Sequence, residues 1–228
     1  MPFRKLIQTA CLAGVLMLLA TAAAAQTGQV AVWTSSEDGK FSLSPGDSLT
    51  LKQSKWTKKK DTIVVEPTKV YQSILGMGGS LEHATCYNLS RLPDDQRDEV
   101  IARLVSPDKG IGMNLMRICI GTSDFVGEPY YSYDDMPKGE TDPSLDRFSI
   151  EKDRAYVLPV LKAALKKNPD LLFFASPWSP PAWMKTNESL RQGELKRDCY
   201  DAYARYFVKY IQAYQAEGIP IYAVTVQN

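Results

Sequence analysis

From Tyr71 onward, short apolar segments alternate with longer amphipathic segments, and this alternation limits the fold more than any other feature of the chain. Segments with the pattern of strands occur at 71–80 (YQSILGMGGS), 113–120 (MNLMRICI), 170–176 (DLLFFAS) and 221–226 (IYAVTV). Segments with the pattern of helices occur between them, at 92–110, 149–169 and 198–217. Apolar strands that alternate with amphipathic helices predict an α/β fold in which helices cover a buried parallel sheet.

The predicted helices carry recognisable start and stop signals. Pro93 begins the first helix, with acidic residues beside it that favour the positive end of the helix dipole. Ser149 can cap the second helix, and Pro159 is expected to kink it. The third has a stripe of mostly aromatic residues at spacings of three and four, and Gly218 closes it.

The order strand, helix, strand, helix, strand, helix, strand predicts the first half of a barrel. A complete (β/α)8 TIM barrel takes about 250 residues, and residues 71–228 provide room for roughly half of that, or about four β/α units. The last residues, YAVTVQN, then form the fourth strand and end at the face where such barrels keep their active sites. We therefore expect the chain to be the N-terminal part of a longer barrel protein.

Residues 26–70 have a different sequence pattern. Short alternating segments (VAVW, KFSL, SLTLKQ and DTIVVE) are separated by turn residues such as Asp38-Gly39. This pattern predicts antiparallel strands, too few to close a sandwich without further strands. We expect residues 26–70 to contribute strands to an appended β-sandwich domain, and residues 71–228 to form the first half of the catalytic barrel.

Residues 1–25 have the features of a secretory signal peptide. Arg4 and Lys5 precede an apolar stretch at 12–20, and small alanine residues end the segment before Gln26. The apolar stretch is too short to span a membrane comfortably. We therefore expect a secreted or periplasmic protein without a transmembrane segment after the signal is removed.

Several kinds of function are excluded by composition and spacing. The formal net charge is +1, and the basic run at 55–60 lacks the aromatic platforms of a nucleic-acid site, so we expect no nucleic-acid partner. The single histidine, His83, excludes a multi-histidine metal site, and no G-x-S-x-G motif accompanies it. GMGGS lacks dinucleotide or P-loop spacing, and its glycines are expected to serve a tight turn. We predict no metal and no cofactor.

The mature chain also contains an odd number of cysteines without a short repeated spacing: Cys86, Cys119 and Cys199. This arrangement does not indicate a disulfide framework, even though the chain carries an export signal. The fold is therefore expected to depend on its hydrophobic core.

Polar and aromatic residues follow each predicted barrel strand. They are Glu82 and His83 after the first, Asp124 and Phe125 after the second, Trp178 and Trp183 after the third, and Asn228 at the fourth. Carboxylates, amides and indoles that converge on one mouth suit a sugar, whose hydroxyls need acceptors and whose C–H face packs on aromatic rings. The sequence therefore predicts a carbohydrate site.

Each candidate also has a structural alternative. Asp124 could cap its own turn, the two tryptophans could pack a rigid proline-rich loop, and His83 could be a hydrogen-bonded structural histidine. Arg117 lies inside an apolar strand, where a buried guanidinium needs a compensating partner, and it implies an acidic residue nearby.

Several blocks of the chain resemble one enzyme family. GMGGSLEHA, GIGMNLMRICIGTSDF, YYSYDDMP, FASPWSPPAWMKTN, YARYFVKYIQAY and YAVTVQN are similar, in order, to blocks of the glycoside hydrolase family that contains glucosylceramidase, also called acid β-glucosidase or glucocerebrosidase. The resemblance implies a retaining β-glycosidase on a (β/α)8 barrel with an appended β-sandwich.

The resemblance also implies roles for individual residues. Asp124 and Trp178, with Phe125 beside them, match positions at the glucosyl group; Asn228 matches the contact to the sugar's 2-hydroxyl. Arg117 matches the arginine beneath the catalytic carboxylates, and Glu82-His83 replaces the Thr-Asp of many members.

The family's acid/base glutamate directly follows the matching asparagine, and its nucleophilic glutamate lies at the seventh strand. Both lie beyond Asn228, so we expect the chain alone to be inactive.

Three functions remain open. The first is hydrolysis of a β-glucoside, either glucosylceramide or a simpler substrate. The second is a related specificity of the same family, a β-1,6-glucanase or a β-xylosidase. The third is a non-catalytic carbohydrate-binding half-barrel, whose open apolar edges would favour association with another chain.

Overall fold

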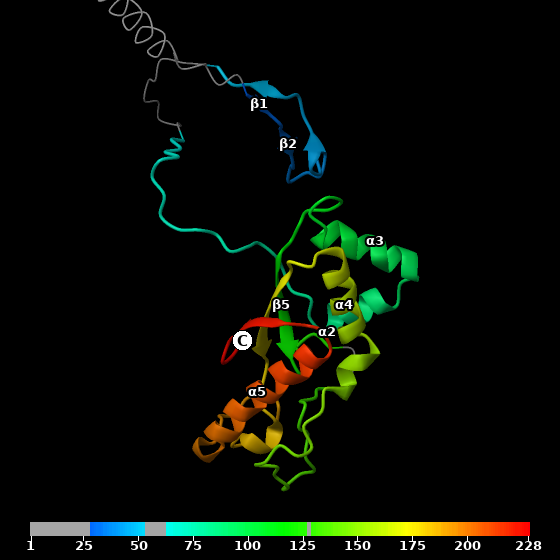
Figure 1. Cartoon of the computed structure of the whole chain (residues 1–228), viewed down its shortest axis with the longest axis vertical. Coiled ribbons are helices and arrows are strands. Elements are labelled where there is room, and N and C mark those ends of the chain that lie inside the picture. Colours follow the sequence, from blue (N-terminus) through cyan, green and yellow to red (C-terminus); the bar gives the residue numbers. More distant parts are fainter. Residues whose placement is uncertain (1–27, 53–62, 127–128) are drawn as a thin grey trace, which may run out of the picture. The chain divides into compact units, whose positions relative to one another are not determined.

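The computed structural model describes residues 28–52, 63–126 and 129–228 (Figure 1). The predicted signal peptide and the basic run at 55–60 lie outside the described residues. The chain divides into two units, residues 1–70 and 71–228, and each is described by itself. No helix in the described parts of the chain combines the length and apolar character needed to cross a membrane.

The described residues of the first unit form two short antiparallel strand pairs. Strand β1 (Gln29–Val30) pairs with β4 (Leu49–Thr50), and β2 (Trp33–Thr34) pairs with β3 (Ser44–Pro45). The predicted strand KFSL is displaced to β3, because Leu43 has a positive φ of 47° that interrupts an extended strand. The predicted strand DTIVVE is wrong over its described residues, 63–66, which have no strand pairing.

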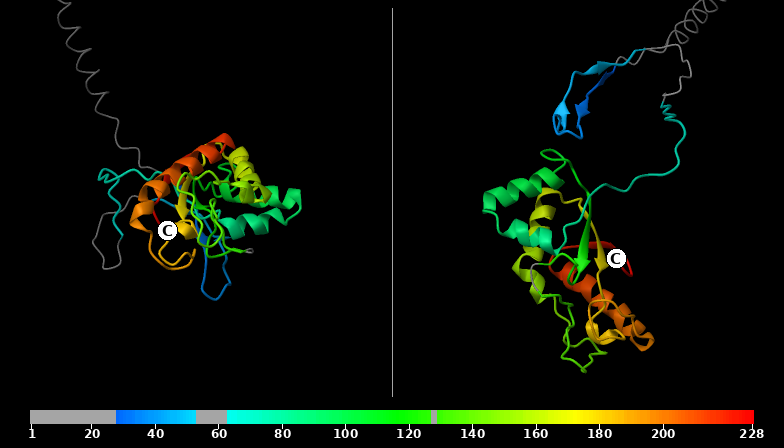
Figure 2. Two further views of the ribbon diagram at one scale, coloured as in Figure 1. Left: turned by 90° about the horizontal axis from the view of Figure 1, so that it is seen from below. Right: turned by 180° about the vertical axis from the view of Figure 1, so that it is seen from behind.

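The second unit contains a parallel sheet in which the strands follow chain order. Strands β5 (Leu115–Ile120), β6 (Leu172–Pro177) and β7 (Ile221–Val224) lie side by side in the order β5-β6-β7. These strands confirm three of the four predicted strands and their parallel arrangement. Among the described residues the sheet does not close, so its topology is that of a partial barrel (Figures 1 and 2).

The predicted strand at 71–80 is mostly wrong, but its end takes the expected place beside β5. The Arg117 N–H donates to the Gly79 carbonyl at 2.9 Å, and the Leu81 N–H donates to the Arg117 carbonyl at 2.9 Å. These bonds form a parallel bridge between Ser80 and Arg117. A Cβ added at Gly78 would overlap the Leu115 carbonyl oxygen, so close backbone approach, rather than the expected tight turn, requires glycine here.

Four α-helices cover this unit: α2 (His83–Ser90), α3 (Asp94–Val105), α4 (Val157–Lys167) and α5 (Tyr200–Ala216). Helix α2 was not predicted, and it occupies a segment that we expected to be a loop after the first strand. Its buried residues His83, Cys86 and Leu89 recur at every third position, which is a helical spacing. The other three helices confirm the predicted pattern, with Asp94 and Asp95 in the first turn of α3.

We expected Pro159 to kink the second predicted helix, but the structure instead divides this segment at Tyr156. A 3₁₀ turn at Glu151–Ala155 precedes α4, and the chain leaves helical geometry at Tyr156, whose φ is −153°. Pro159 consequently lies in the first turn of α4, where its missing N–H removes no helical hydrogen bond. The predicted cap at Ser149 is wrong: the Ser149 hydroxyl accepts a hydrogen bond from the Glu151 N–H at 3.2 Å, but Ile150 is the N-cap residue of the 3₁₀ turn and Tyr156 is that of α4.

Helix α5 supplies a large part of the aromatic core. Tyr206, Tyr210 and Tyr214 are fully buried, and Gly218 ends the helix region with a φ of 78°. The prediction that β7 is a buried strand is wrong: Tyr222 on this strand is 57% exposed. Strand β7 pairs with β6 along one edge, and the described residues do not bury the outward side chains of β7.

Candidate active site

The carboxyl ends of the parallel strands bring Arg117 and Asn228 together. The Arg117 Nη2 donates to the Asn228 Oδ1 at 2.6 Å, and the Asn228 backbone N–H donates to the Pro177 carbonyl at 3.1 Å. The end of the chain is thus tied to both β5 and β6. Among the described residues, Arg117 pairs with this amide oxygen instead of the acidic partner that we expected. The guanidinium is only half-buried, so water still solvates part of its charge and a carboxylate is not required.

Cys119 lies two residues after Arg117 on β5 and therefore on the same face of the strand. Burial raises the pKa of the Cys119 thiol to about 11, although the positive charge of Arg117 acts in the opposite direction. The thiol is consequently protonated at neutral pH and is poorly suited to act as a nucleophile. On the neighbouring strand β6, the Ser176 hydroxyl accepts a hydrogen bond at 2.7 Å from the hydroxyl of Thr225, the first residue after β7.

Trp178 directly follows β6, and its half-buried indole lies against a tyrosine. The ring centroids of Tyr130 and Trp178 are 4.7 Å apart with an interplanar angle of 31°, and the Arg191 guanidinium carbon lies 4.7 Å from the Tyr130 ring centroid. The Gln227 side chain donates to the Trp178 carbonyl at 3.0 Å. Tyr130, Arg191 and Gln227 were not predicted from the sequence, because contacts between separate loops leave no periodic signal.

Asp124 and Phe125 are exposed in the loop that follows β5. The Ser123 hydroxyl donates to the Phe125 carbonyl at 2.7 Å, so Ser123 makes the side-chain hydrogen bond within this turn. The alternative in which Asp124 caps the turn thus loses support. The Asp124 carboxylate is accessible as a hydrogen-bond acceptor.

His83 and Trp183 are buried structural residues, as their structural alternatives predicted. His83 is 2% exposed, and its Nε2 forms a hydrogen bond with the Tyr156 hydroxyl. The Trp183 indole N–H donates to the Asp134 carboxylate at 2.9 Å. Glu82 is half-buried at the start of α2, where its carbonyl accepts the Cys86 N–H at 2.9 Å.

A buried carboxylate, that of Asp153, was also not predicted from the sequence. Asp153 is 1% exposed and accepts hydrogen bonds from Tyr131, Tyr133 and Tyr214 at 2.6, 2.5 and 2.5 Å respectively. Burial raises the Asp153 pKa, while the three hydroxyl donors act in the opposite direction. The aromatic stripe of α5 predicted burial of Tyr214, but not that its hydroxyl meets an acid.

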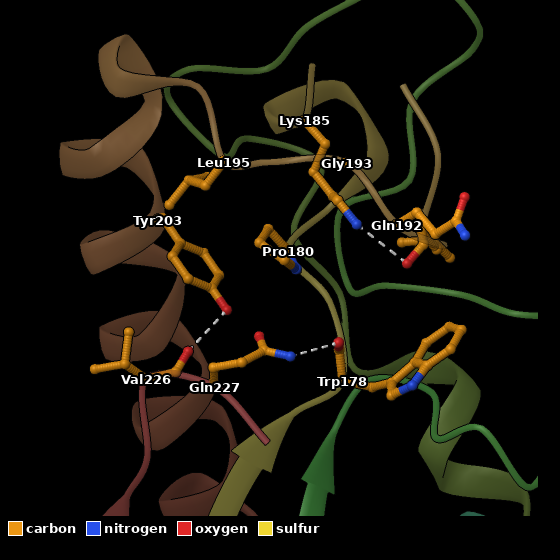
Figure 3. A pocket seen from close by; sticks show the side chains of 10 residues that line it. Trp178, Pro180, Lys185, Gln192, Gly193, Leu195, Tyr203, Val226 and Gln227 are labelled. Atoms are coloured by element: carbon orange, nitrogen blue, oxygen red, sulfur yellow. Dashed lines mark hydrogen bonds between the residues drawn. The ribbon is translucent and has the colours of Figure 1, made fainter. Parts of the chain in front are cut away.

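A cavity of about 380 Å³ lies beside Trp178, between the loop after β6, the start of α5 and the end of β7 (Figure 3). Its polar lining includes Lys185, Gln192 and Gln227. Lys185 is 5% exposed, its Nζ donates to the Ser179 hydroxyl at 3.0 Å and the Leu190 carbonyl at 3.2 Å, and burial lowers its pKa. Amide, ammonium and indole groups at this end of the sheet suit a ligand rich in hydroxyls.

Comparison with known families identifies the family of the second unit. The model of the TIM-barrel domain of glycosyl hydrolase family 30 matches residues 74–228. This range includes the whole parallel sheet and every candidate site residue described above.

Individual relatives agree with the family match. The endo-1,6-β-D-glucanase of Neurospora crassa is 35% identical over 93% of this chain and 45% of its own length. The lysosomal acid glucosylceramidase of Mus musculus is 34% identical over 73% of this chain and 33% of its own length. The chain thus spans less than half the length of these relatives.

Solved structures confirm the partial barrel. A solved endo-β1,6-glucanase superposes with a TM-score of 0.70 at 34% identity, over 89% of this chain and 43% of that one. The Salmonella typhimurium protein SrfJ superposes with a TM-score of 0.71 at 29% identity, over 80% of this chain and 40% of that one.

Proposed function

The chain belongs to glycosyl hydrolase family 30, and from that premise we propose that it supplies the glucose-binding part of an exported retaining β-glycosidase. The observation that carries this proposal is the hydrogen bond between Arg117 and Asn228 at the carboxyl ends of the parallel strands. Because active sites of TIM barrels lie at this face, the pair stands where a substrate would bind.

The Arg117–Asn228 bond also assigns the orientation of the asparagine amide. Arginine only donates hydrogen bonds, so the Asn228 atom that faces Arg117 must be the carbonyl oxygen. The Asn228 amide nitrogen is then left to donate to a sugar hydroxyl, in agreement with the 2-hydroxyl contact that the family resemblance implies. In the proposed site, Asp124 accepts from glucosyl hydroxyls, and Trp178 supplies an indole N–H and an aromatic surface.

Retaining hydrolysis needs two carboxyl groups about 5–5.5 Å apart, one to protonate the leaving oxygen and one to form the glycosyl-enzyme. We propose that glutamates of the complete barrel supply both groups, and that the described residues bind and orient the glucosyl group for them. Arg117 would then contribute positive charge beneath the carboxylates and favour their ionised forms.

For the substrate we propose a β-1,6-glucan. The similarity to an endo-1,6-β-glucanase extends over nearly the whole chain, and the cavity beside Trp178 has a polar lining that suits a second sugar unit. Glucosylceramide is the second candidate, because the glucosylceramidase relatives are about as similar in sequence. A second cavity of about 690 Å³, lined by Tyr200, Phe207 and Val226, is apolar and would suit a lipid chain.

Binding to the chain tests the glucose-binding role. We expect isothermal titration calorimetry to show tighter binding of gentiotriose, a β-1,6-linked trisaccharide, than of laminaritriose or xylotriose. Replacement of Asn228 by alanine should weaken gentiotriose binding about tenfold, which corresponds to about 1.4 kcal/mol. Asn88→Ala, at an exposed position on α2, is the control and should leave binding unchanged.

The other outcomes select among the alternatives. Preferred binding of xylotriose would favour a β-xylosidase, and preferred binding of glucosylceramide micelles would favour a glucosylceramidase. Turnover of a β-glucoside by the purified chain itself would contradict the assignment of both catalytic carboxylates to other parts of the barrel. Equal binding by wild type and Asn228→Ala would remove the proposed site.

A further inference from the structure

Strand β6 does not by itself fix the orientation of the Trp178 side chain. It is the first residue after the strand, and the hydrogen bond from the Gln227 side chain fixes its carbonyl rather than its ring. The indole N–H makes no hydrogen bond within the described parts of the chain, in contrast to the N–H of Trp183. An indole that must meet a sugar in one orientation therefore needs support from neighbouring side chains.

Tyr130 provides a face for the indole. The ring centroids are 4.7 Å apart and the rings are tilted by 31° to each other, so Tyr130 limits rotation of the Trp178 ring on that side. Tyr130 is itself half-buried and lies in the loop after β5, whereas Trp178 follows β6. The contact thus couples the loops of two neighbouring strands.

Arg191 fixes Tyr130 in turn through two contacts. Its guanidinium carbon lies 4.7 Å from the centre of the Tyr130 ring, and its Nη2 donates to the Tyr130 hydroxyl at 2.8 Å. A cation over the ring and a hydrogen bond at the hydroxyl define both the position and the rotation of the tyrosine. Arg191, Tyr130 and Trp178 therefore form a three-member stack.

The backbone at Arg191 is held in a compact loop. The Asn187 side chain donates to the Arg191 carbonyl at 2.9 Å, and the Arg191 N–H donates to the Ser189 hydroxyl at 3.1 Å. A bridge between Lys185 and Leu195 closes the base of this loop. Because the loop is fixed by its own hydrogen bonds, Arg191 can hold Tyr130 before any ligand binds.

We infer that Tyr130 and Arg191 are positioning residues that set the orientation of the Trp178 indole for the sugar. The inference rests on the proposed function for its purpose, since it assigns the stack to the glucose-binding site. Neither residue needs to touch the ligand. Their effect on binding is transmitted through Trp178.

The orientation of the indole is measurable without a ligand. In protein labelled with ¹⁵N-tryptophan, the indole N–H signal of Trp178 is identified by its loss in Trp178→Phe. We expect this signal to shift and broaden in both Tyr130→Ala and Arg191→Met. The first variant removes the ring beside the indole, and the second removes the guanidinium that holds that ring. The signal of buried Trp183 should stay in place and reports on the fold.

The chain offers a matched control. Arg91, just after helix α2, forms the same kind of pair with Tyr87 on the helix: its guanidinium carbon lies 5.5 Å from the ring centre, and it donates a 3.1 Å hydrogen bond to the hydroxyl. Arg91→Met removes one arginine–tyrosine pair and should leave the Trp178 signal unchanged. Tyr130→Phe, which keeps the ring and removes the hydroxyl, should give a smaller shift than Tyr130→Ala and serves if the alanine variant does not fold.

Titration with gentiobiose then measures the effect on binding. We expect the dissociation constant to rise three- to tenfold in Arg191→Met and to stay within twofold of wild type in Arg91→Met. An unchanged Trp178 signal in the folded stack variants, or an unchanged dissociation constant beside a shifted signal, would overturn the inference. If gentiobiose does not bind to wild type, the proposed function fails, while the Trp178 signal in the free protein still decides whether the stack orients the indole.

Discussion

At the scale of residues, the hydroxyl groups of the buried tyrosines have unequal roles. Tyr214 donates to Asp153 at 2.5 Å, whereas the Tyr210 hydroxyl is buried without a hydrogen-bond partner in the described part of the chain. The two residues lie one turn apart on α5, and both are fully buried. They therefore allow the value of one hydroxyl to be compared in nearly the same surroundings.

We predict opposite effects for Tyr214→Phe and Tyr210→Phe. The first removes a donor to a buried carboxylate and should lower the free energy of unfolding by about 2 kcal/mol. The second removes an unsatisfied buried hydroxyl and should leave the free energy of unfolding unchanged or raise it by up to about 1 kcal/mol. Urea unfolding at pH 7 measures both, and equal losses in the two variants would contradict the hydrogen-bond assignment.

Asp134 gives a pH-dependent prediction. Burial raises its pKa to about 6, above the ordinary value near 4 in the unfolded chain. Because the folded state then binds the proton more tightly, the stability from this group is complete below about pH 4 and is lost as the pH rises through about 6. Over this window the stability of wild type relative to Asp134→Asn should fall by about 2 kcal/mol.

Urea unfolding of wild type and Asp134→Asn between pH 3.5 and 7.5 measures this difference. Asp108→Asn, at an exposed position, provides the control and should show no comparable pH dependence. A constant difference between wild type and Asp134→Asn would show that Asp134 keeps an ordinary pKa.

At the scale of elements, the parallel sheet depends on the backbone approach at Gly78. A Cβ at this position would overlap the Leu115 carbonyl, whereas one at the adjacent Gly79 would meet no atom within 4 Å. The segment with Gly78 also supplies the carbonyls that accept from β5. The two neighbouring glycines thus differ in what they tolerate.

We therefore predict that Gly78→Ala lowers the free energy of unfolding by about 3 kcal/mol, since the backbone must shift away from β5 to accommodate the methyl group. Gly79→Ala should change it by less than about 1 kcal/mol. Chemical denaturation of both variants measures the contrast. Similar values for the two would mean that the first segment does not pair closely with β5.

The elements differ in how far the sequence predicts them. Strands β5 and β6 and helices α3 and α5 follow from apolar patterns that burial imposes directly on the sequence. Helix α2 was missed because a short helix shows few repeats of its pattern, and the strand expected at 71–80 was too long because apolar residues there remain exposed.

The site is predictable in part. The ends of the predicted strands indicated that Asp124, Trp178 and Asn228 lie in one region. The Asp153 cluster and the stack on Trp178 depend on contacts between distant loops, which single-sequence patterns do not encode.

At the scale of the whole molecule, the parallel sheet of the second unit presents an apolar edge. Tyr222 and Val226, on and just after β7, are 57% and 77% exposed. Strand β7 pairs only with β6 among the described residues, so the backbone groups of its other edge are available for pairing. Such an edge favours association with another apolar strand edge.

We predict that the purified chain self-associates in a concentration-dependent manner through this edge. Tyr222→Lys should shift the sedimentation-velocity distribution toward the monomer, because a charged side chain opposes strand pairing. Ile111→Lys changes an apolar side chain that is 70% exposed elsewhere in the second unit, and it should leave association unchanged. Equal effects of the two variants would indicate non-specific hydrophobic contact instead.

The Asp153 cluster has a consequence for how substrate preference can diverge on this scaffold. Two of its three tyrosines, Tyr131 and Tyr133, anchor the middle of the loop between β5 and the 3₁₀ turn at Glu151–Ala155. Residues nearer the strand, such as Phe125, are exposed and make few packing contacts. Mutations can accumulate there without loosening the anchor, so a library confined to positions 124–126 should yield altered sugar preference in variants that still fold.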